Sequence, residues 1–101
     1  AGRIVFFAAR RGVRAVGLCS VSAGFSTFAC GEVGSFEDFY LEPCFRGKGA
    51  ARLLANAARD WCRDRGIASL TVTCAPCDEG MYRALGFDTP LGQTLAHLRE
   101  G

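Results

Sequence analysis

The sequence predicts a single α/β domain over residues 1–101, built on a mixed and mostly antiparallel sheet. Two observations predict this class. Runs of β-forming residues dominate residues 3–41, and the apolar spacing then changes to that of an amphipathic helix over residues 49–65. A chain of 101 residues buries roughly 65% of its unfolded surface, so we expect one thin core.

Three strands are expected first. Residues 3–9 and 15–22 are rich in β formers and flank an arginine-rich turn, which predicts a hairpin. Residues 23–34 contain three glycines and are expected to form a loop or a second hairpin connection. The sequence of residues 34–41 predicts a third strand. Pro43 is expected to end it because proline cannot continue a ladder of hydrogen bonds.

The most clearly patterned element is a helix over residues 49–65. Leu54, Ala58 and Cys62 recur at helical spacing on one face, while charged and polar residues fall largely on the other. Gly66 follows and supplies the left-handed residue that commonly ends a helix.

Three shorter elements are expected after this helix. Residues 69–74 alternate apolar and polar side chains, which predicts a half-buried strand parallel to the third one. Residues 78–85 predict a short helix that Pro76 opens and Gly86 closes. Residues 93–99 alternate again and predict a closing strand.

Charge and hydropathy exclude several classes of protein. Lys and Arg total 12 against 10 Asp and Glu, and this net charge of +2 is too weak for a nucleic-acid-binding surface. The longest apolar run, from Ile4 to Ala9, is far shorter than the ~20 residues of a membrane span, so we expect a soluble cytoplasmic protein. A single His and cysteines placed mostly in apolar segments predict reduced core cysteines and no metal site. The six cysteines are Cys19, Cys30, Cys44, Cys62, Cys74 and Cys77.

A glycine-rich turn between the third strand and the long helix carries the clearest chemical signal. Glycines let a backbone approach an anion closely, and the free N–H groups of a helix's first turn donate to phosphate oxygens. The turn therefore predicts a pyrophosphate site, and the alternative is a turn that binds no ligand. The Walker A loop and the dinucleotide fingerprint are both absent. The residues concerned are Arg46, Gly47, Lys48, Gly49, Ala50 and Ala51.

Three motifs in order make the chain resemble the GNAT-type acyl-CoA N-acyltransferases. The family pattern Arg/Gln-x-x-Gly-x-Gly/Ala matches at Arg46, Gly49 and Ala51. A further motif lies just before it, at residues 37–43, and another about 30 residues after it, at residues 81–87. The resemblance begins at the second strand of that fold, so the usual first strand and first two helices are expected to be missing. The sequence around the first of these motifs, at residues 36–41, is most similar to the polyamine and small-amine branch of the family.

The resemblance implies a GNAT-like fold with a phosphate-binding helix and acetyl-CoA as cosubstrate. It also implies that Tyr82 protonates the departing thiolate, and the alternative role of this ring is packing. Relatives often carry an Asn a few residues upstream, where this chain has Cys77, Asp78 and Glu79, and we expect Asp78 to face away or to cap its helix. The implied cofactor-binding residues are Phe39, Tyr40 and Leu41 for the pantetheine arm, through their backbones, and Arg46, Gly47, Lys48, Gly49, Ala50 and Ala51 for the pyrophosphate.

Glu37 and Asp38 are the candidate catalytic bases. A primary amine with a pKa near 10 is mostly protonated at neutral pH, so a carboxylate that removes a proton makes attack possible. Neighbouring residues of a strand point to opposite faces, and only one of the two is therefore expected to face the cleft. Glu37 is preferred because it would share a face with Phe39 and Leu41. The alternative is that neither carboxylate takes part in the chemistry.

Together these features predict an N-acetyltransferase that moves an acetyl group from acetyl-CoA to a primary amine, on a small molecule or a peptide, by direct attack. The second hypothesis is a catalytically incomplete member that only binds CoA or forms oligomers. Residues 3–9 are expected to form an apolar edge strand, and such edges are usually paired or covered. We therefore expect a homodimer, with neither nucleic acid nor membrane as a partner.

Overall fold

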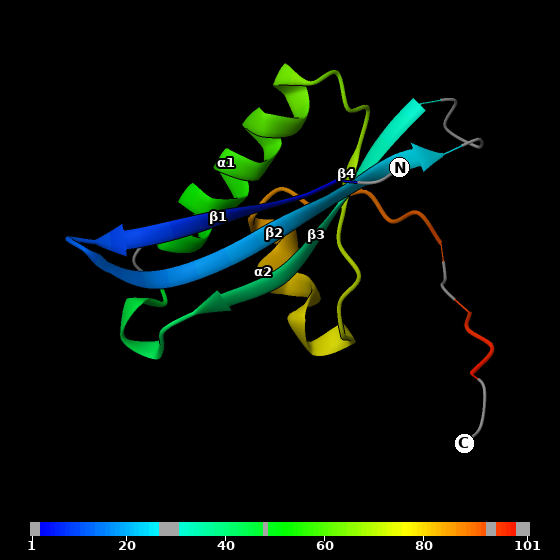
Figure 1. The fold of residues 1–101 in the computed structure, drawn as a ribbon. Coiled ribbons are helices and arrows are strands. Elements are labelled where there is room, and N and C mark those ends of the chain that lie inside the picture. Colours follow the sequence, from blue (N-terminus) through cyan, green and yellow to red (C-terminus); the bar gives the residue numbers. More distant parts are fainter. Residues whose placement is uncertain (1–2, 27–30, 48, 93–94, 99–101) are drawn as a thin grey trace.

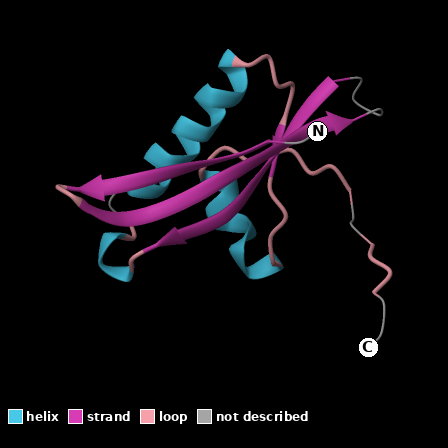
Figure 2. Cartoon of the chain, in the orientation of Figure 1, coloured by secondary structure: helices cyan, strands magenta, loops and turns pink. Residues whose placement is uncertain are grey.

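The computed structural model describes residues 3–26, 31–47, 49–92 and 95–98. One four-stranded sheet forms a continuous layer, with the longer helix running along it (Figure 1, Figure 2). The strands are β1 (Arg3–Arg11), β2 (Arg14–Ser26), β3 (Gly31–Leu41) and β4 (Leu70–Thr71), and the helices are α1 (Ala50–Asp64) and α2 (Glu79–Ala84). β1, β2 and β3 are antiparallel neighbours, whereas β4 pairs parallel to β3. This mixed, mostly antiparallel sheet confirms the predicted fold class.

The second hairpin is longer than the sequence suggested. β2 continues to Ser26 and β3 begins at Gly31, so most of the glycine-containing stretch forms paired strands and the interpretation as a loop is wrong there. Packing explains the glycine at position 34, because a Cβ there would lie 3.2–3.3 Å from side chains of β2, α1 and β4. Gly34 therefore lets the helix and the neighbouring strand approach β3 closely.

Helix α1 confirms the expectation for residues 49–65. Leu54, Ala58 and Cys62 are buried on the face that packs on the sheet, and Gly66 follows the helix with a φ of 70°. Burial of this apolar face stabilises the helix far more than its intrinsic propensity does. The core cluster comprises Cys19, Val21, Ala23, Phe36, Leu54, Ala58, Cys62 and Ile67.

The predictions of the last two strands were inaccurate: the first strand is shorter than predicted, and the second is not formed by residues 95–98. β4 covers Leu70–Thr71 and not residues 69–74, because the chain beyond it diverges from β3. Residues 95–98 form no strand; their side chains are exposed and the segment leads away from the sheet (Figure 1). Alternating apolar and polar residues form no ladder of hydrogen bonds where no neighbouring strand is present. The short helix predicted over residues 78–85 is confirmed as α2.

Of the five cysteines that the structure describes, two confirm the expectation of core cysteines and three contradict it. Cys19 and Cys62 are buried, whereas Cys44, Cys74 and Cys77 are exposed. All five are free thiols, and Cys30 lies outside the described residues. In the described part of the chain, neither helix is long and apolar enough to cross a membrane.

Candidate active site

A pocket opens where β3 and β4 separate. The two strands pair only at Gly34 with Leu70 and at Ser35 with Thr71. Beyond these pairs the chain leaves β3, and a pocket of about 270 Å³ lies between the two segments and α2. Its lining contains all three predicted catalytic residues. The lining residues are Ser35, Phe36, Glu37, Asp38, Phe39, Val72, Thr73 and Tyr82.

A β-bulge in β3 shapes one wall of this pocket. Two residues of β3, Asp38 and Phe39, oppose one residue of β2, Cys19. Asp38 has a φ of 53°, and among the described residues no other non-glycine residue has a positive φ. Aspartate tolerates this left-handed conformation better than most residues do. The bulge therefore breaks the two-residue alternation on which the sequence interpretation relied.

Both candidate bases consequently lie on the same face of the sheet. Glu37 stands opposite Ser20 in the β2–β3 register, and Ser20 Oγ donates a hydrogen bond to Asp38 Oδ2 at 2.9 Å. The hydroxyl of Ser35 lies 3.4 Å from Glu37 Oε2. The expectation of opposite faces was wrong, because the inserted residue turns Asp38 back toward its neighbour's side.

The shared face proposed for Glu37, Phe39 and Leu41 is also wrong. Leu41 is buried and Phe39 packs against the core, with its ring centroid 5.6 Å from that of Phe36. Glu37 is exposed on the opposite side. The bulge adds one residue to β3, so odd-numbered side chains point to one face before the bulge and to the other face after it.

Ser20 is a site residue that the sequence analysis missed. Its relative exposure is 0%, although it carries a hydroxyl, and it donates that hydroxyl proton to Asp38. A buried hydroxyl needs a partner, and this bond satisfies it while fixing the carboxylate. One serine within an apolar strand gives no signal for such a role until the cross-strand partner is known.

Tyr82 lies in a cluster of aromatic rings at the other wall of the pocket. Its ring centroid is 6.5 Å from Phe36, 6.2 Å from Phe39 and 6.0 Å from Phe87. The contacts with Phe36 and Phe87 are edge-to-face, the geometry that aromatic pairs prefer. Tyr82 therefore packs and lines the pocket at once, and the two roles considered for it are compatible.

The surroundings of Tyr82 keep its hydroxyl protonated. Burial raises the pKa of Tyr82 above its usual value near 10, and the charges of Asp78 and Cys74 raise this pKa further. The phenol is then a proton donor throughout the neutral range. Asp78 occupies the N-cap position of α2 but makes no side-chain capping hydrogen bond, so of the two alternatives expected for it the capping one is wrong.

The glycine turn has the open backbone that an anion site needs. Gly47 and Gly49 have φ values of 76° and 86°, and a Cβ at either position would meet no atom within 4 Å. α1 begins directly after the turn at Ala50, with Ala51 in its first turn. Gly49 at the N-cap has no side chain to cap this helix end, and the first turn of α1 contains no acidic residue, so among these described residues no side chain competes for the N–H groups. Lys48 lies outside the described residues.

Strand β3 connects the pocket to this turn. Beyond Ser35, no strand pairs with the β4-facing edge of β3 in the part of the chain that the structure describes. Phe39, Tyr40 and Leu41 lie on this stretch, and Arg46 Nε donates to the Leu41 carbonyl oxygen at 3.2 Å. Arg46 therefore ties the glycine turn to the end of β3. Among the described residues, no group of three or more His, Cys, Asp or Glu could hold a metal ion.

The splayed strands β3 and β4, with a glycine turn that leads from β3 into α1, define an α/β domain with a pocket at the edge of its sheet. The sequence model of the acetyltransferase (GNAT) family matches residues 1–87, and the chain therefore belongs to this family. A search of curated protein sequences finds no match.

Solved structures share the fold. Glucosamine-6-phosphate N-acetyltransferase from Arabidopsis thaliana is 21% identical, with a TM-score of 0.73, over 85% of this chain and 59% of its own. An integron cassette protein from the mobile metagenome of Cole Harbour Salt Marsh is 32% identical, with a TM-score of 0.73, over 96% of this chain and 62% of its own. The aminoglycoside acetyltransferase AAC(6')-Iy, solved with a CoA-linked bisubstrate analogue, is 22% identical, with a TM-score of 0.80, over 95% of this chain and 69% of its own. The chain thus spans about three-fifths of the length of the first two.

Proposed function

We propose that the chain transfers an acetyl group from acetyl-CoA to a primary amine. The observation that carries this proposal is the single pocket that brings together Glu37, Asp38 and Tyr82. The strand that forms one wall of the pocket leads directly into the glycine turn. A thioester held along this strand would have its phosphates at the turn and its reactive carbon near the three side chains.

The phosphate end of acetyl-CoA is assigned to the turn before α1. Positive φ values at Gly47 and Gly49 and the open space around them suit a phosphate that approaches the backbone closely. The edge of β3 over Phe39, Tyr40 and Leu41, with which no described strand pairs, is proposed to bind the pantetheine amides as an added strand would. Ala50 and Ala51 supply N–H groups at the helix end.

The reaction end is assigned to the three pocket side chains. At neutral pH only about one alkylamine molecule in a thousand is unprotonated, so Glu37 or Asp38 accepts the ammonium proton, directly or through water. The freed nitrogen lone pair attacks the thioester carbonyl carbon, the nitrogen gives up its second proton to water, and the carbon–sulfur bond breaks. Tyr82 donates its hydroxyl proton to the sulfur, and the phenolate recovers a proton from solvent.

Mass spectrometry of the protein with acetyl-CoA and a pooled library of amines, polyamines included, tests this function. An acetylated amine that forms only with active protein supports it. Calorimetric binding of acetyl-CoA without acetylation of any amine would overturn the proposal and favour the alternative, a member that binds CoA but is catalytically incomplete. Failure to bind acetyl-CoA would overturn both.

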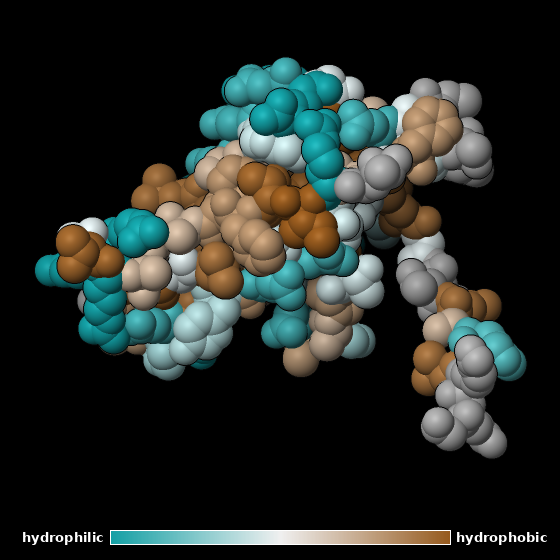
Figure 3. Space-filling view, viewed as in Figure 1, coloured by the Kyte–Doolittle hydropathy of each residue, from teal (hydrophilic) through white to brown (hydrophobic). Residues whose placement is uncertain are grey.

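We also propose that the protein forms a homodimer through β1. β1 is an edge strand, and Ile4 and Phe6 are 65% and 60% exposed on it. Figure 3 shows apolar side chains gathered along this side of the molecule. Antiparallel two-fold pairing centred on Phe6 sets Ile4 opposite Ala8 of the second copy, so that apolar residues meet.

Sedimentation equilibrium at micromolar concentration tests the dimer. The unmodified chain is expected to sediment as a dimer, and Phe6→Lys as a folded monomer, because lysine on an edge strand opposes pairing. A folded monomer of the unmodified chain would overturn this proposal and leave the proposed function untouched.

A further inference from the structure

Two kinds of donor bind the last carbonyl groups at the C-terminal end of α2: backbone N–H groups and arginine side chains. Two of its last carbonyl groups are satisfied by the turn that follows. Phe87 N–H donates to the Tyr82 oxygen at 3.0 Å, and Gly86 N–H donates to the Arg83 oxygen at 3.0 Å. With Gly86 at a φ of 107°, these bonds form the Schellman motif that often ends a helix.

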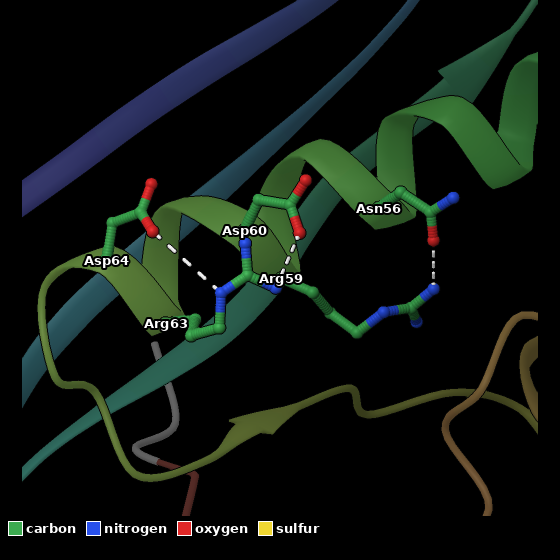
Figure 4. Close-up of polar contacts among 5 residues, drawn as sticks. All are labelled: Asn56, Arg59, Asp60, Arg63 and Asp64. Atoms are coloured by element: carbon green, nitrogen blue, oxygen red, sulfur yellow. Dashed lines mark hydrogen bonds and ion pairs between the residues drawn. The ribbon is translucent and has the colours of Figure 1, made fainter.

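The next two carbonyls are satisfied by arginines of α1. Arg52 Nη2 donates to the Ala84 oxygen at 3.1 Å, and Arg59 Nη1 donates to the Leu85 oxygen. Arg59 also donates through Nη2 to Asn56 Oδ1, which fixes the direction of its guanidinium (Figure 4). A charged donor on a terminal carbonyl is a stronger bond than a neutral one.

This anchoring adds to the ring contacts that Tyr82 makes with Phe36, Phe39 and Phe87. None of the residues of α2 itself is fully buried, so the bonds to its last carbonyls also matter for its position. Tyr82 is part of the anchored turn: its carbonyl accepts the Phe87 N–H, and the two rings meet edge to face. A movement of this turn would therefore move the phenol.

We propose that Arg59, supported by Arg52, is a positioning residue that holds α2 on α1 and so keeps the Tyr82 hydroxyl in the pocket. The inference rests on the proposed function of Tyr82. The same helix begins at the glycine turn, so α1 sets the distance between the phosphate end and the phenol. Arg52 stands directly after Ala51, the last residue of the predicted cradle.

Gly86 gives a second geometric sign of this contact. A Cβ at position 86 would lie 2.8 Å from Arg59 Nη1, closer than real Cβ contacts come. The guanidinium therefore lies directly against the backbone of the turn. Glycine at this position serves both the positive φ and the approach of the arginine.

Arg63 provides a matched control on the same helix. It lies one turn further along α1 and pairs with Asp60 at 3.1 Å and Asp64 at 3.8 Å, as Figure 4 shows. No contact joins it to α2 among the interactions of the described residues. Arg63→Met removes a guanidinium from α1 without touching the anchored turn.

Steady-state kinetics tests the positioning role. Arg59→Met keeps the length of the side chain but removes its donors, and we expect kcat to fall about 10-fold with KM for acetyl-CoA within about 2-fold. Arg59→Lys should recover part of the loss, and Arg63→Met should match the unmodified protein. Equal kcat in Arg59→Met and Arg63→Met, or a rise in KM with kcat unchanged, would overturn the proposal.

Titration of the phenol tests the same proposal without any need for activity. The chain has two tyrosines, so a Tyr40→Phe background leaves Tyr82 as the one phenol absorbing near 295 nm. Loosening of α2 exposes Tyr82, and Arg59→Met should lower its pKa toward about 10. Arg63→Met should leave this pKa unchanged, with circular dichroism showing that all variants are folded. Identical titration in both variants would overturn the positioning role even if no amine is acetylated.

Discussion

The two ends of the proposed acetyl-CoA cleft are built in different ways. At the proposed phosphate end, Gly47 and Gly49 shape the backbone through positive φ values, and no atom of the described residues lies within 4 Å of a Cβ at either position. At the proposed reaction end, Asp38 from β3 and Tyr82 from α2 line one pocket, and Ser20 from β2 donates a hydrogen bond to Asp38. One end depends on local conformation, and the other depends on register and packing.

This difference teaches where a mutation acts. A change in the glycine turn alters one short stretch of backbone and leaves the core as it is. A change at the reaction end passes through the bulge or the aromatic cluster, which contact the core. Substitutions at the two ends should therefore differ in whether they alter binding or the chemical step.

Replacing Gly49 should give the largest loss of CoA binding. Gly49→Val places a branched side chain at a φ of 86°, in front of the helix N–H groups, and we expect binding about 100-fold weaker by calorimetry. Gly66→Val is the matched control at the other end of α1, with a φ of 70° and equally open surroundings. Both variants should lose similar stability, about 1–2 kcal/mol, but only the first should lose affinity. Equal affinity in the two variants would remove the turn from the binding site.

Removing the phenol oxygen should affect the chemical step. Tyr82→Phe keeps the ring contacts and removes the proton donor, so kcat should fall about 10- to 100-fold with little change in KM for acetyl-CoA. The expected stability is close to that of the unmodified protein, as thermal unfolding would show. An unchanged kcat would leave Tyr82 with its packing role alone.

The two carboxylates should differ in a paired comparison. Asp38 has an oxygen engaged by Ser20 at 2.9 Å, whereas the hydrogen bond of Glu37 among the described residues is the 3.4 Å contact with Ser35. Glu37→Gln should therefore lower kcat/KM about 10-fold at neutral pH and shift the profile to higher pH, where more amine is unprotonated. Asp38→Asn keeps an acceptor for Ser20 and a residue type that tolerates positive φ, and should cost about 2- to 3-fold. A larger loss in Asp38→Asn would assign the base to Asp38.

Alkaline pH should lower the free energy of unfolding through Cys19, which lies opposite the bulge. Of the four predicted effects, this one should be the smallest. Burial raises the pKa of Cys19 from 9.0 to about 11, so the folded state keeps a proton that the unfolded state has lost. Stability should therefore fall as pH rises from about 9 toward 11. Urea unfolding should show that the difference in free energy of unfolding between the unmodified protein and Cys19→Ala becomes smaller over this pH range. A difference independent of pH would contradict this linkage.

Much of the fold was predictable because its signals are local. The hairpin of β1 and β2 and the helix over residues 49–65 follow from residue type and apolar period. The strands expected over residues 69–74 and 93–99 failed for a shared reason. Alternation shows that a segment suits a strand, but only a neighbour at hydrogen-bonding distance makes it one.

The candidate site divides in the same way. The glycine turn and the two carboxylates were predicted from residue type and from what the reaction needs, and Tyr82 was predicted from the resemblance to the family; all of them stay predictions. The relation between Glu37 and Asp38 was not, because one inserted residue opposite Cys19 reverses the side to which later residues point. Arg59 was not found either, since a surface arginine on a helix gives no sign of the carbonyl it will meet.

The sequence by itself determined the α/β class, the long helix and the glycine turn that opens it, because backbone preference and apolar period act over a few residues. Tertiary structure alone decided that both carboxylates share a face and that α1 anchors α2. These depend on which residues stand opposite one another across β2 and β3, or across two helices, and such pairings join positions far apart in the chain.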